Sequence, residues 1–457
     1  MKIKASKNTL SGHIQVPGSK SHTIRALLLA SLAEGTSNIS NPLPSADCLS
    51  TSRAIPLIGA ELENDPAKLE EDKVWVVKGA GSKVHLPSNV IDVGNSGSLL
   101  YFLSPITATF EGWSIFTGDE SIRKRPVAHV VDVLNQLGAQ AYISQPGAKT
   151  CPMIIKGPIN AGRKVVTEGA VSSQYISGLM MSAIRMNGTL HIELTDPKET
   201  PYLTMTQKWL EKVGVTCRIS SDFKHIEVDG PVDLKAFDAT IPSDWEAVAF
   251  PLMAALITDS KITIDNIDIG GTQGDDAIVD IFKSAGADIT VDKENSCLVV
   301  AGGKRLTTEN LPGKELHVKI SGFPDAICAI AATACFIEGT TVIEDAEVCR
   351  RKETDRIKVL KSELEKLGTS VEEGADYMII HGHSPLNADG SKNKDFKLHG
   401  GTVDSYLDHR IAMSLACLGL GLAEGEAVTV KDAECCSVSF PHFFDVMNGI
   451  GAGFKSE

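Results

Sequence analysis

Hydrophobic and polar positions repeat along this chain with a long period. The clearest sign is a helix-like stretch that ends on Gly and passes into an amphipathic strand. Glycine suits such a junction because it adopts a left-handed helix C-cap without steric cost. The junctions lie 79, 76, 72, 82 and 83 residues apart, at Gly59, Gly138, Gly214, Gly286, Gly368 and Gly451. The pattern therefore predicts six β/α units of about 72 to 83 residues.

A second signature runs in phase with the first: an Ala/Leu-rich helix ends and a glycine opens a β-branched strand. It occurs at Gly35, Gly112, Gly188, Gly339 and Gly425. The fourth unit has Asp259-Ser260 instead, but its strand 261–264 is intact. Each unit then has one apolar helix, one amphipathic helix and several strands. Because helices that are apolar all round are normally buried, we expect an α/β fold in which three units surround three buried helices with sheet, in each of two domains.

The composition agrees with two soluble domains. At 457 residues the chain is too long for one ordinary core, and 42% hydrophobic and 22% charged residues are typical of globular proteins. No apolar run reaches 18 residues and none follows the basic start, so we expect a cytoplasmic protein without a membrane partner or a secretory leader. Ten cysteines without a C-x-x-C pair favour buried thiols in a reducing compartment.

The net charge of −14 disfavours nucleic acid as a partner, because phosphate backbones demand a broad basic surface. Any anion site must therefore be a local concentration of Lys and Arg. Two basic clusters stand out, at 123–125 and 350–356. The alternative for each is a solvated face. However, Arg125 before Pro126 looks like a positioned loop, and Lys352 and Arg356 would present two cations to one ligand if their segment is helical.

A short polar segment precedes each apolar helix. Free N–H groups and the helix dipole make such a position anion-binding, although Ser, Asp and Asn alone would also serve as N-caps. Lys20, Arg25 and Arg410 add positive charge that capping does not require. The segments are 17–22, 94–98, 170–174, 242–245, 322–325 and 406–410. His381 and His383 are the only close histidine pair, and they lack a third ligand, so we expect no metal site.

Six of these motifs, taken in order over roughly residues 10 to 450, resemble those of the EPSP synthase family. They are Pro17-Gly18-Ser19-Lys20-Ser21, Arg125-Pro126, Ser172-Ser173-Gln174, Pro324-Asp325, the run from Arg350 to Arg356, and Asp408-His409-Arg410. The resemblance implies an inside-out α/β barrel, enolpyruvyl transferase-like, with a discontinuous domain of 1–17 and 242–457. Residues 18–241 would form an inserted domain, and the active site would lie in the cleft between them. The crossings near 16–18 and 240–242 would act as hinges.

The resemblance also implies the reaction: shikimate 3-phosphate adds through its 5-hydroxyl to phosphoenolpyruvate (PEP), and phosphate leaves. Asp325 would accept a proton, with Glu353 and Lys20 in proton transfer. The residues expected to hold the PEP phosphate are Lys20, Gly97 and Arg125, and those for its carboxylate are Arg356 and Arg410. The residues expected to hold shikimate 3-phosphate are Ser21, Arg25, Ser172, Ser173, Tyr202 and Lys352. Gln174 would touch both ligands, and Asn95 is expected among the binding residues. No cofactor is implied, and we expect a monomer that glyphosate inhibits.

Four positions depart from the family pattern. Tyr101 and Val438 stand where the family has Arg and Lys, Val348 replaces an Asn, and Glu199 replaces a Ser beside Thr200. Two of these changes remove cations, and one brings a carboxylate near an expected phosphate. Arg123 or Arg351 are candidates to compensate.

These departures leave two alternatives open. One is a same-fold transferase with another acceptor or reduced activity. The UDP-N-acetylglucosamine branch is disfavoured, because this chain has Lys20-Ser21 rather than Lys-Asn and no Cys between Thr107 and Pro126. The other alternative is a non-catalytic anion sensor, which would need the cations but not Asp325 and Glu353.

Overall fold

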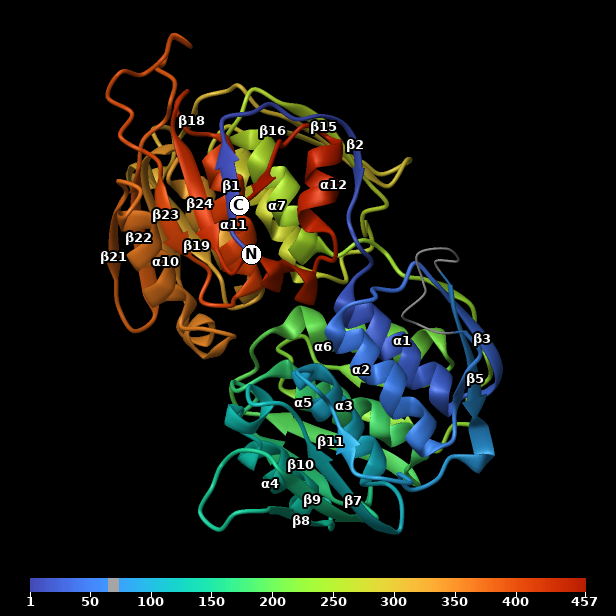
Figure 1. Ribbon diagram of the computed structural model, residues 1–457. Coiled ribbons are helices and arrows are strands. Elements are labelled where there is room, and N and C mark those ends of the chain that lie inside the picture. Colours follow the sequence, from blue (N-terminus) through green and yellow to red (C-terminus); the bar gives the residue numbers. More distant parts are fainter. Residues whose placement is uncertain (65–73) are drawn as a thin grey trace. The chain divides into compact units, whose positions relative to one another are not determined.

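The computed structural model describes residues 1–64 and 74–457, which divide into two compact units. The discontinuous unit comprises Met1–Pro17 and Ser243–Glu457, and the inserted unit comprises Gly18–Pro242. Helices and strands alternate along both (Figure 1), so the predicted mixed α/β class is confirmed.

Three sheets form the discontinuous unit. Their strand orders are β23-β24-β1-β25, β16-β17-β15-β2 and β18-β20-β22-β21, with β19 also paired to β20. The bounds are β1 Ile3–Ser6, β2 Ser11–Gln15, β15 Lys261–Asp265, β16 Asp288–Asp292, β17 Cys297–Ala301, β18 Leu306–Thr307, β19 Glu315–Lys319, β20 Ile337–Glu344, β21 Ser370–Glu373, β22 Tyr377–Gly382, β23 Gly401–Asp404, β24 Ala427–Lys431 and β25 Lys455–Ser456. Strand β1 pairs antiparallel with β24, and β2 pairs parallel with β15. These two pairings explain why the first residues of the chain belong to its C-terminal half.

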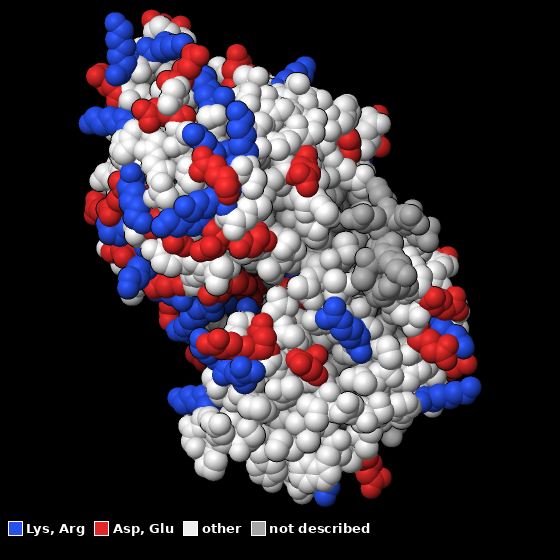
Figure 2. All heavy atoms as spheres, in the orientation of Figure 1, with Lys and Arg blue, Asp and Glu red and all other residues white. Residues whose placement is uncertain are grey.

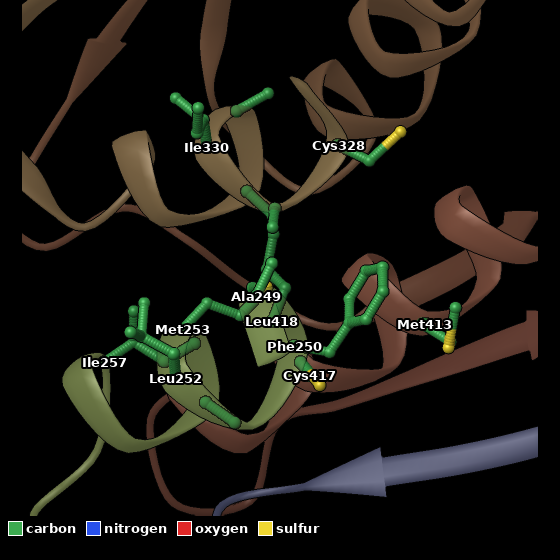
Figure 3. Packing of buried hydrophobic residues seen from close by; sticks show 14 of the residues in the cluster. Ala249, Phe250, Leu252, Met253, Ile257, Cys328, Ile330, Met413, Cys417 and Leu418 are labelled. Carbon is green, nitrogen blue, oxygen red and sulfur yellow. The ribbon is translucent and has the colours of Figure 1, made fainter. Parts of the chain in front are cut away.

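Three helices of this unit are buried along their whole length: α7 (Trp245–Leu256), α9 (Ile327–Ala334) and α11 (His409–Leu420). They pack against one another (Figure 3), with Phe250, Ile330 and Leu418 among the side chains fully removed from water. Their apolar sequences require this burial, because each Leu, Ile or Phe contributes about 1.5–3 kcal/mol when it is removed from water. The amphipathic helices are α8 (Ile278–Ser284), α10 (Arg356–Glu365) and α12 (Phe443–Gly449).

The inserted unit has the same kinds of parts. Its sheets have the orders β14-β3-β5-β4, β6-β7-β9-β8 and β10-β11-β13-β12. The bounds are β3 Glu34–Ser40, β4 Glu61–Leu62, β5 Val74–Ala80, β6 Ile91–Asp92, β7 Gly112–Thr117, β8 Gln140–Ile143, β9 Met153–Gly157, β10 Lys164–Thr167, β11 Gly188–Leu194, β12 Cys217–Ile219, β13 His225–Gly230 and β14 Ala239–Thr240. The helices are α1 Lys20–Leu32, α2 Ala46–Ala54, α3 Gly97–Thr107, α4 Ala128–Gln136, α5 Ser173–Ser182 and α6 Thr200–Lys212. Helices α1, α3 and α5 are its apolar, almost wholly buried helices.

Both glycine signatures adopt the predicted conformation. All six helix-ending glycines have φ between 86° and 106°, and the five strand-opening glycines have φ between 92° and 130°. A side chain in that region is strained, which is why the sequence uses Gly there. Gly178 has a different reason, because a Cβ there would lie 2.2 Å from the carbonyl oxygen of Tyr101, where α5 crosses α3.

The chain crosses between the units twice, and in each unit a backbone hydrogen bond joins residues that flank the two crossings. In the discontinuous unit, Asp244 N donates to the carbonyl of Pro17 (2.9 Å). In the inserted unit, Ser19 N donates to the carbonyl of Pro242 (2.8 Å). Neighbouring residues therefore carry the chain out of one unit and back into it.

Figure 2 shows how charged side chains are distributed over one face of the molecule. Lys and Arg are interspersed with Asp and Glu on the face drawn in Figure 2. All ten cysteines are free thiols, and nine of them are buried, as the sequence predicts. No helix in the described residues is both long and apolar enough to cross a membrane.

Candidate active site

In the discontinuous unit, the starts of the three buried helices meet through charged side chains. Arg410, the second residue of α11, donates through Nη2 to Glu246, the second residue of α7. Its Nε lies 3.3 Å from Oδ1 of Asp325, in the short helix Pro324–Ala326 that leads into α9. The predicted polar segments before these helices therefore come together in space.

Asp325 is the centre of this group. Its carboxylate accepts from Nη1 of Arg356 (2.5 Å) and from Nζ of Lys352 (3.4 Å), besides lying near Arg410. Its side chain keeps 16% exposure, whereas that of Arg356 has none. We call the group the Asp325 cluster; its members are Asp325, Glu246, Lys352, Glu353, Arg356, Asp408 and Arg410.

Arg356 is held on three sides by carboxylates. Besides Asp325, Nη2 donates to Glu353 (2.6 Å) and Nε donates to Asp408 (2.9 Å). Asp408 also caps α11 by accepting from the N–H of Arg410 (3.0 Å). A guanidinium with this set of partners is fixed in position, because a planar fork matched to carboxylates loses little freedom on binding.

The acidic neighbours keep both arginines charged. Burial pulls the pKa of Arg356 downward, but Asp408, Glu353 and Asp325 outweigh burial and raise that pKa above its usual range. Burial likewise pulls down the pKa of Arg410, and Glu246 with Asp325 raises it further than burial lowers it. Both arginines therefore stay positively charged although they are buried.

One step of the sequence argument is wrong here. Residues 353–355 are not helical, and α10 begins only at Arg356, so Lys352 and Arg356 are not successive-turn neighbours on one helix. Both nevertheless contact the carboxylate of Asp325, and the backbone at Lys352 is not helical (φ −80°, ψ −149°). Tertiary structure, rather than helical spacing, brings the two cations together.

The other arginines of that run have structural partners. Arg350 donates to Asp355 (2.8 Å) and Glu373 (2.8 Å), and the exposed Arg351 pairs with Glu347 on its own turn. Arg123 donates to the carbonyl of Gly118 (2.8 Å). None of these contacts gives Arg123 or Arg351 the compensating role that the sequence left open.

In the inserted unit, Arg25 of α1 is buried among neutral groups. Its guanidinium donates to Thr206 Oγ1 (2.8 Å), Ser177 Oγ (3.2 Å) and the carbonyls of Ser21 (3.0 Å) and Tyr202 (3.3 Å). Burial lowers its pKa to about 9, and no carboxylate of the described residues pairs with it. Because a buried cation is stabilised by an opposite charge, this position favours an anionic ligand.

The same contacts bring the starts of α1, α3 and α5 together. Arg25 lies 4.6 Å from the centre of the Phe102 ring and contacts Ser177. All three residues lie within about two turns of the first residue of their helices. Lys20, the first residue of α1, has its Nζ 3.7 Å from Asp47 of α2.

The predicted PEP-phosphate residues Gly97 and Arg125 lie side by side. A Cβ on Gly97 would stand 2.7 Å from Nη1 of Arg125, so glycine at the start of α3 makes room for that guanidinium. Arg125 follows a short helix, Ile122–Lys124, in extended conformation, as the loop reading predicts. Asn95 lies in the turn before α3.

The start of α5 carries the predicted serines. Ser172 caps the helix by accepting from the N–H of Gln174 (3.2 Å), so the capping interpretation is correct for this residue. Ser96, Asp244 and Asp408 cap their helices in the same way, whereas Ser19 does not. Both donors of Ser173, its N–H and its Oγ, point to Oε2 of Glu199 (3.1 and 3.0 Å).

Of the other departures, Tyr101 has a structural role. The hydroxyl of the buried Tyr101 donates to the carbonyl of Pro126 (2.8 Å), and its ring packs against His129. Tyr101 thus anchors the backbone of the loop that presents Arg125. Val348 and Val438 are half-buried.

Sequence reasoning missed several groups that hold the site together. Glu246 and Asp408 bind the two arginines, and Thr206 and Ser177 bind Arg25. A signal existed for Glu246, since a carboxylate within an otherwise apolar helix is rarely buried without a cationic partner. Within residues 1–64 and 74–457, no three His, Cys, Asp or Glu side chains are grouped to hold a metal.

Comparisons with known proteins cover nearly the whole chain. The family model described as EPSP synthase (3-phosphoshikimate 1-carboxyvinyltransferase) matches residues 4–447. A 3-phosphoshikimate 1-carboxyvinyltransferase of Ruminiclostridium cellulolyticum is 36% identical over 99% of both chains. One of Methanocaldococcus jannaschii is 37% identical over 98% of this chain and 97% of the relative.

Solved structures give the same picture. An EPSP synthase from Acinetobacter baumannii matches with a TM-score of 0.82 at 25% identity, covering 100% of both chains. The enolpyruvyl transferase NikO from Streptomyces tendae matches with a TM-score of 0.75 at 17% identity, over 99% of this chain and 98% of that one, a likeness of fold alone.

Proposed function

This chain belongs to the EPSP synthase (3-phosphoshikimate 1-carboxyvinyltransferase) family, and from that premise we propose that it transfers the enolpyruvyl group of PEP to the 5-hydroxyl of shikimate 3-phosphate. The products are EPSP and phosphate, in the shikimate pathway of aromatic amino-acid biosynthesis. The main support for this proposal is the sequence similarity to curated relatives, which extends over nearly the whole chain. Its two substrates are small molecules. Nothing in the comparisons favours a different acceptor.

The reaction needs one proton added and one removed. The 5-hydroxyl oxygen bonds to C2 of PEP and loses its proton while C3 gains one, giving a tetrahedral intermediate. The C2–O bond to phosphate then breaks, and C3 returns its proton as the double bond reforms. We assign the proton acceptor to Asp325 because it is the partly exposed carboxylate among three cations. Glu353 and Lys20 are assigned to the accompanying proton transfers.

The anionic groups of the substrates need cations and N–H donors. We assign the PEP carboxylate to Arg356 and Arg410, and the PEP phosphate to Lys20, Gly97 and Arg125. Both arginines are already oriented by Glu246, Asp325 and Asp408. Orientation before binding is favourable, since a fixed guanidinium gives up less conformational entropy to its ligand.

Shikimate 3-phosphate is assigned to the starts of α1 and α5 together with Lys352. Its binding residues are Ser21, Arg25, Asn95, Ser172, Ser173, Gln174, Tyr202 and Lys352. The lack of a carboxylate partner for Arg25 supports this assignment, because the acceptor supplies the missing negative charge. Binding should therefore stabilise the inserted unit.

We further propose that the units are two domains, 1–17 with 242–457 and 18–241, that close around an active site in the cleft between them. Each would be one half of an inside-out α/β barrel built from three β/α repeats around its buried helices. The two crossings near Pro17 and Pro242 would be the hinges. The protein is expected to act as a monomer, because the two domains supply every assigned residue.

The direct test is phosphate release. Purified protein incubated with shikimate 3-phosphate and PEP should release phosphate and form EPSP, and Asp325→Ala should abolish most of that release. Small-angle scattering should show compaction on addition of shikimate 3-phosphate. No phosphate release by the wild-type protein would overturn the proposed function, and unchanged scattering would overturn the closure.

A further inference from the structure

Glu199 occupies an unusual position at the start of α6. Its backbone is left-handed (φ 51°), a conformation that costs a non-glycine residue about 1–3 kcal/mol, and its side chain is largely buried, with 7% exposure. Strain of this kind persists only where surrounding contacts fix it. The contacts of the Glu199 carboxylate are therefore the place to look for a reason for this backbone conformation.

That carboxylate reaches the first residue of α5. A single oxygen, Oε2, accepts from the backbone N–H of Ser173 at 3.1 Å and from its hydroxyl at 3.0 Å. The first N–H groups of a helix have no partner within the helix and lie at the positive end of its dipole, so they favour an anion. Glu199 thus supplies, from the protein itself, a carboxylate at the start of α5, where an anion is favoured.

The backbone that carries Glu199 is anchored independently of this contact. Arg25 donates to Tyr202 O at 3.3 Å and to Thr206 Oγ1 at 2.8 Å, both in the first two turns of α6. The carbonyl of Glu199 accepts from Tyr202 N (3.1 Å). The start of α6 is therefore held by contacts other than that between the Glu199 carboxylate and Ser173.

We propose that Glu199 is a specificity-determining residue whose carboxylate competes with the phosphate of the acceptor for the two donors of Ser173. This inference rests on the proposed function, which assigns Ser173 to shikimate 3-phosphate. The acceptor binds as the Glu199 side chain leaves Ser173, since two anions cannot share one pair of donors at this distance. An acceptor without the phosphate leaves the Glu199–Ser173 contact in place and meets no competition, so Glu199 lowers the affinity for the phosphorylated acceptor in particular.

The competition predicts that removing the carboxylate tightens acceptor binding. Glu199→Ser leaves both donors of Ser173 to the phosphate of the acceptor. The KM for shikimate 3-phosphate should therefore fall at least tenfold, because hydrogen bonds to a charged group are stronger than neutral ones. Glu199→Gln keeps the length and loses the charge, so its KM should fall between those of the wild type and Glu199→Ser. The KM for PEP, which has no contact assigned to Ser173, is the internal reference.

The control is Glu211→Ser, which removes one exposed negative charge from the same helix α6. It should leave both KM values unchanged. A second readout uses inorganic phosphate alone as the probe. Phosphate at millimolar concentration should raise the melting temperature of Glu199→Ser by several degrees more than that of the wild type, because the donors of Ser173 are released.

The outcomes separate this inference from the proposed function. If the wild type releases phosphate from the two substrates but both Glu199 variants keep or raise the KM for shikimate 3-phosphate, Glu199 only caps α5 and the inference is overturned. If the wild type shows no turnover, the proposed function fails and the role of Glu199 toward the acceptor fails with it. The melting experiment then decides only the competition between the Glu199 carboxylate and phosphate for Ser173. An equal response of wild type and Glu199→Ser to phosphate then overturns it, and a larger response of the variant supports it.

Discussion

The two groups of site residues solve the problem of burying cations in opposite ways. In the discontinuous unit, Arg356 and Arg410 are surrounded by carboxylates, which raise the pKa of each. In the inserted unit, Arg25 is surrounded by hydroxyls and carbonyls, and burial lowers its pKa to about 9. The first environment already contains four carboxylates beside its three cations before any ligand arrives. The second contains a cation among neutral groups.

The difference indicates a division of labour. A group in which acids and cations contact one another suits proton transfer, because a proton moves within it without creating an isolated buried charge. A cation that contacts only neutral groups beside helix starts suits anion binding, because the ligand supplies the missing charge. Substitutions in the two groups should therefore affect different kinetic constants: kcat in the discontinuous unit, and the KM for shikimate 3-phosphate in the inserted unit.

The largest effect is expected at Asp325. Asp325→Ala removes the carboxylate shared by Lys352, Arg356 and Arg410, so kcat should fall by about 10²–10⁴-fold. Phosphate release measures this, and circular dichroism checks folding. Asp325→Asn, which keeps the shape, should be nearly as inactive, while Glu347→Gln on the exposed surface should be fully active. A folded Asp325→Asn variant with more than a tenth of wild-type kcat would contradict the role of the Asp325 carboxylate in proton transfer.

The next effect is expected at Arg25. Arg25→Lys keeps the charge but loses the fork that reaches Thr206, Ser177 and two carbonyls, so the KM for shikimate 3-phosphate should rise about 10–100-fold. The KM for PEP should change little. Arg53→Lys, an exposed arginine of α2, is the matched control. Equal losses for both substrates would mean that Arg25 does not act on one ligand alone.

A smaller effect is expected at Gly97. In Gly97→Ala the new Cβ would stand 2.7 Å from Nη1 of Arg125, so the guanidinium must move away from it. The KM for PEP should rise about fivefold by loss of alignment, and inhibition by glyphosate should weaken in parallel. Gly449→Ala, where no atom lies within 4 Å, is the control. An unchanged KM for PEP would contradict the assignment of Gly97 to the PEP phosphate.

Acid should lower the stability of both units, an effect on folding rather than on catalysis. Burial lowers the pKa of His129 and of His409 to about 4, below the ordinary value of 6.5. The unfolded chain therefore binds these protons first as pH falls, and stability declines between pH 6.5 and 4 by about 1–3 kcal/mol for each histidine. Above pH 6.5 neither group affects stability.

Urea unfolding at pH 7, 5 and 4 measures this decline. His129→Phe keeps a ring against Tyr101 and Tyr175 and should flatten the acid-side loss, as should His409→Phe for the other unit. His225→Phe, an exposed residue on β13, should not. If the acid-side loss is the same in all variants, the two histidines are not its source.

Much of the fold could be predicted from the sequence because its signals are local. The glycines at helix ends and strand starts, and the apolar helices that become α1, α7 and α11, were predicted from residues adjacent in the chain. The N-cap roles of Ser172 and Asp408 are local in the same sense. The helical reading of 352–356 failed because the contact with Asp325 overrides the intrinsic preference of that short segment.

Local sequence is enough to predict where helices and strands alternate and where lysines and arginines stand along the chain, because side-chain period and backbone preference act over a few residues. The partner of each cation depends on long-range packing: Glu246 reaches Arg410 across 164 residues, and Thr206 reaches Arg25 across 181. Such pairs form where helix starts meet, and that meeting depends on the packing of whole helices against sheets. No local pattern records which acid or hydroxyl will be brought there.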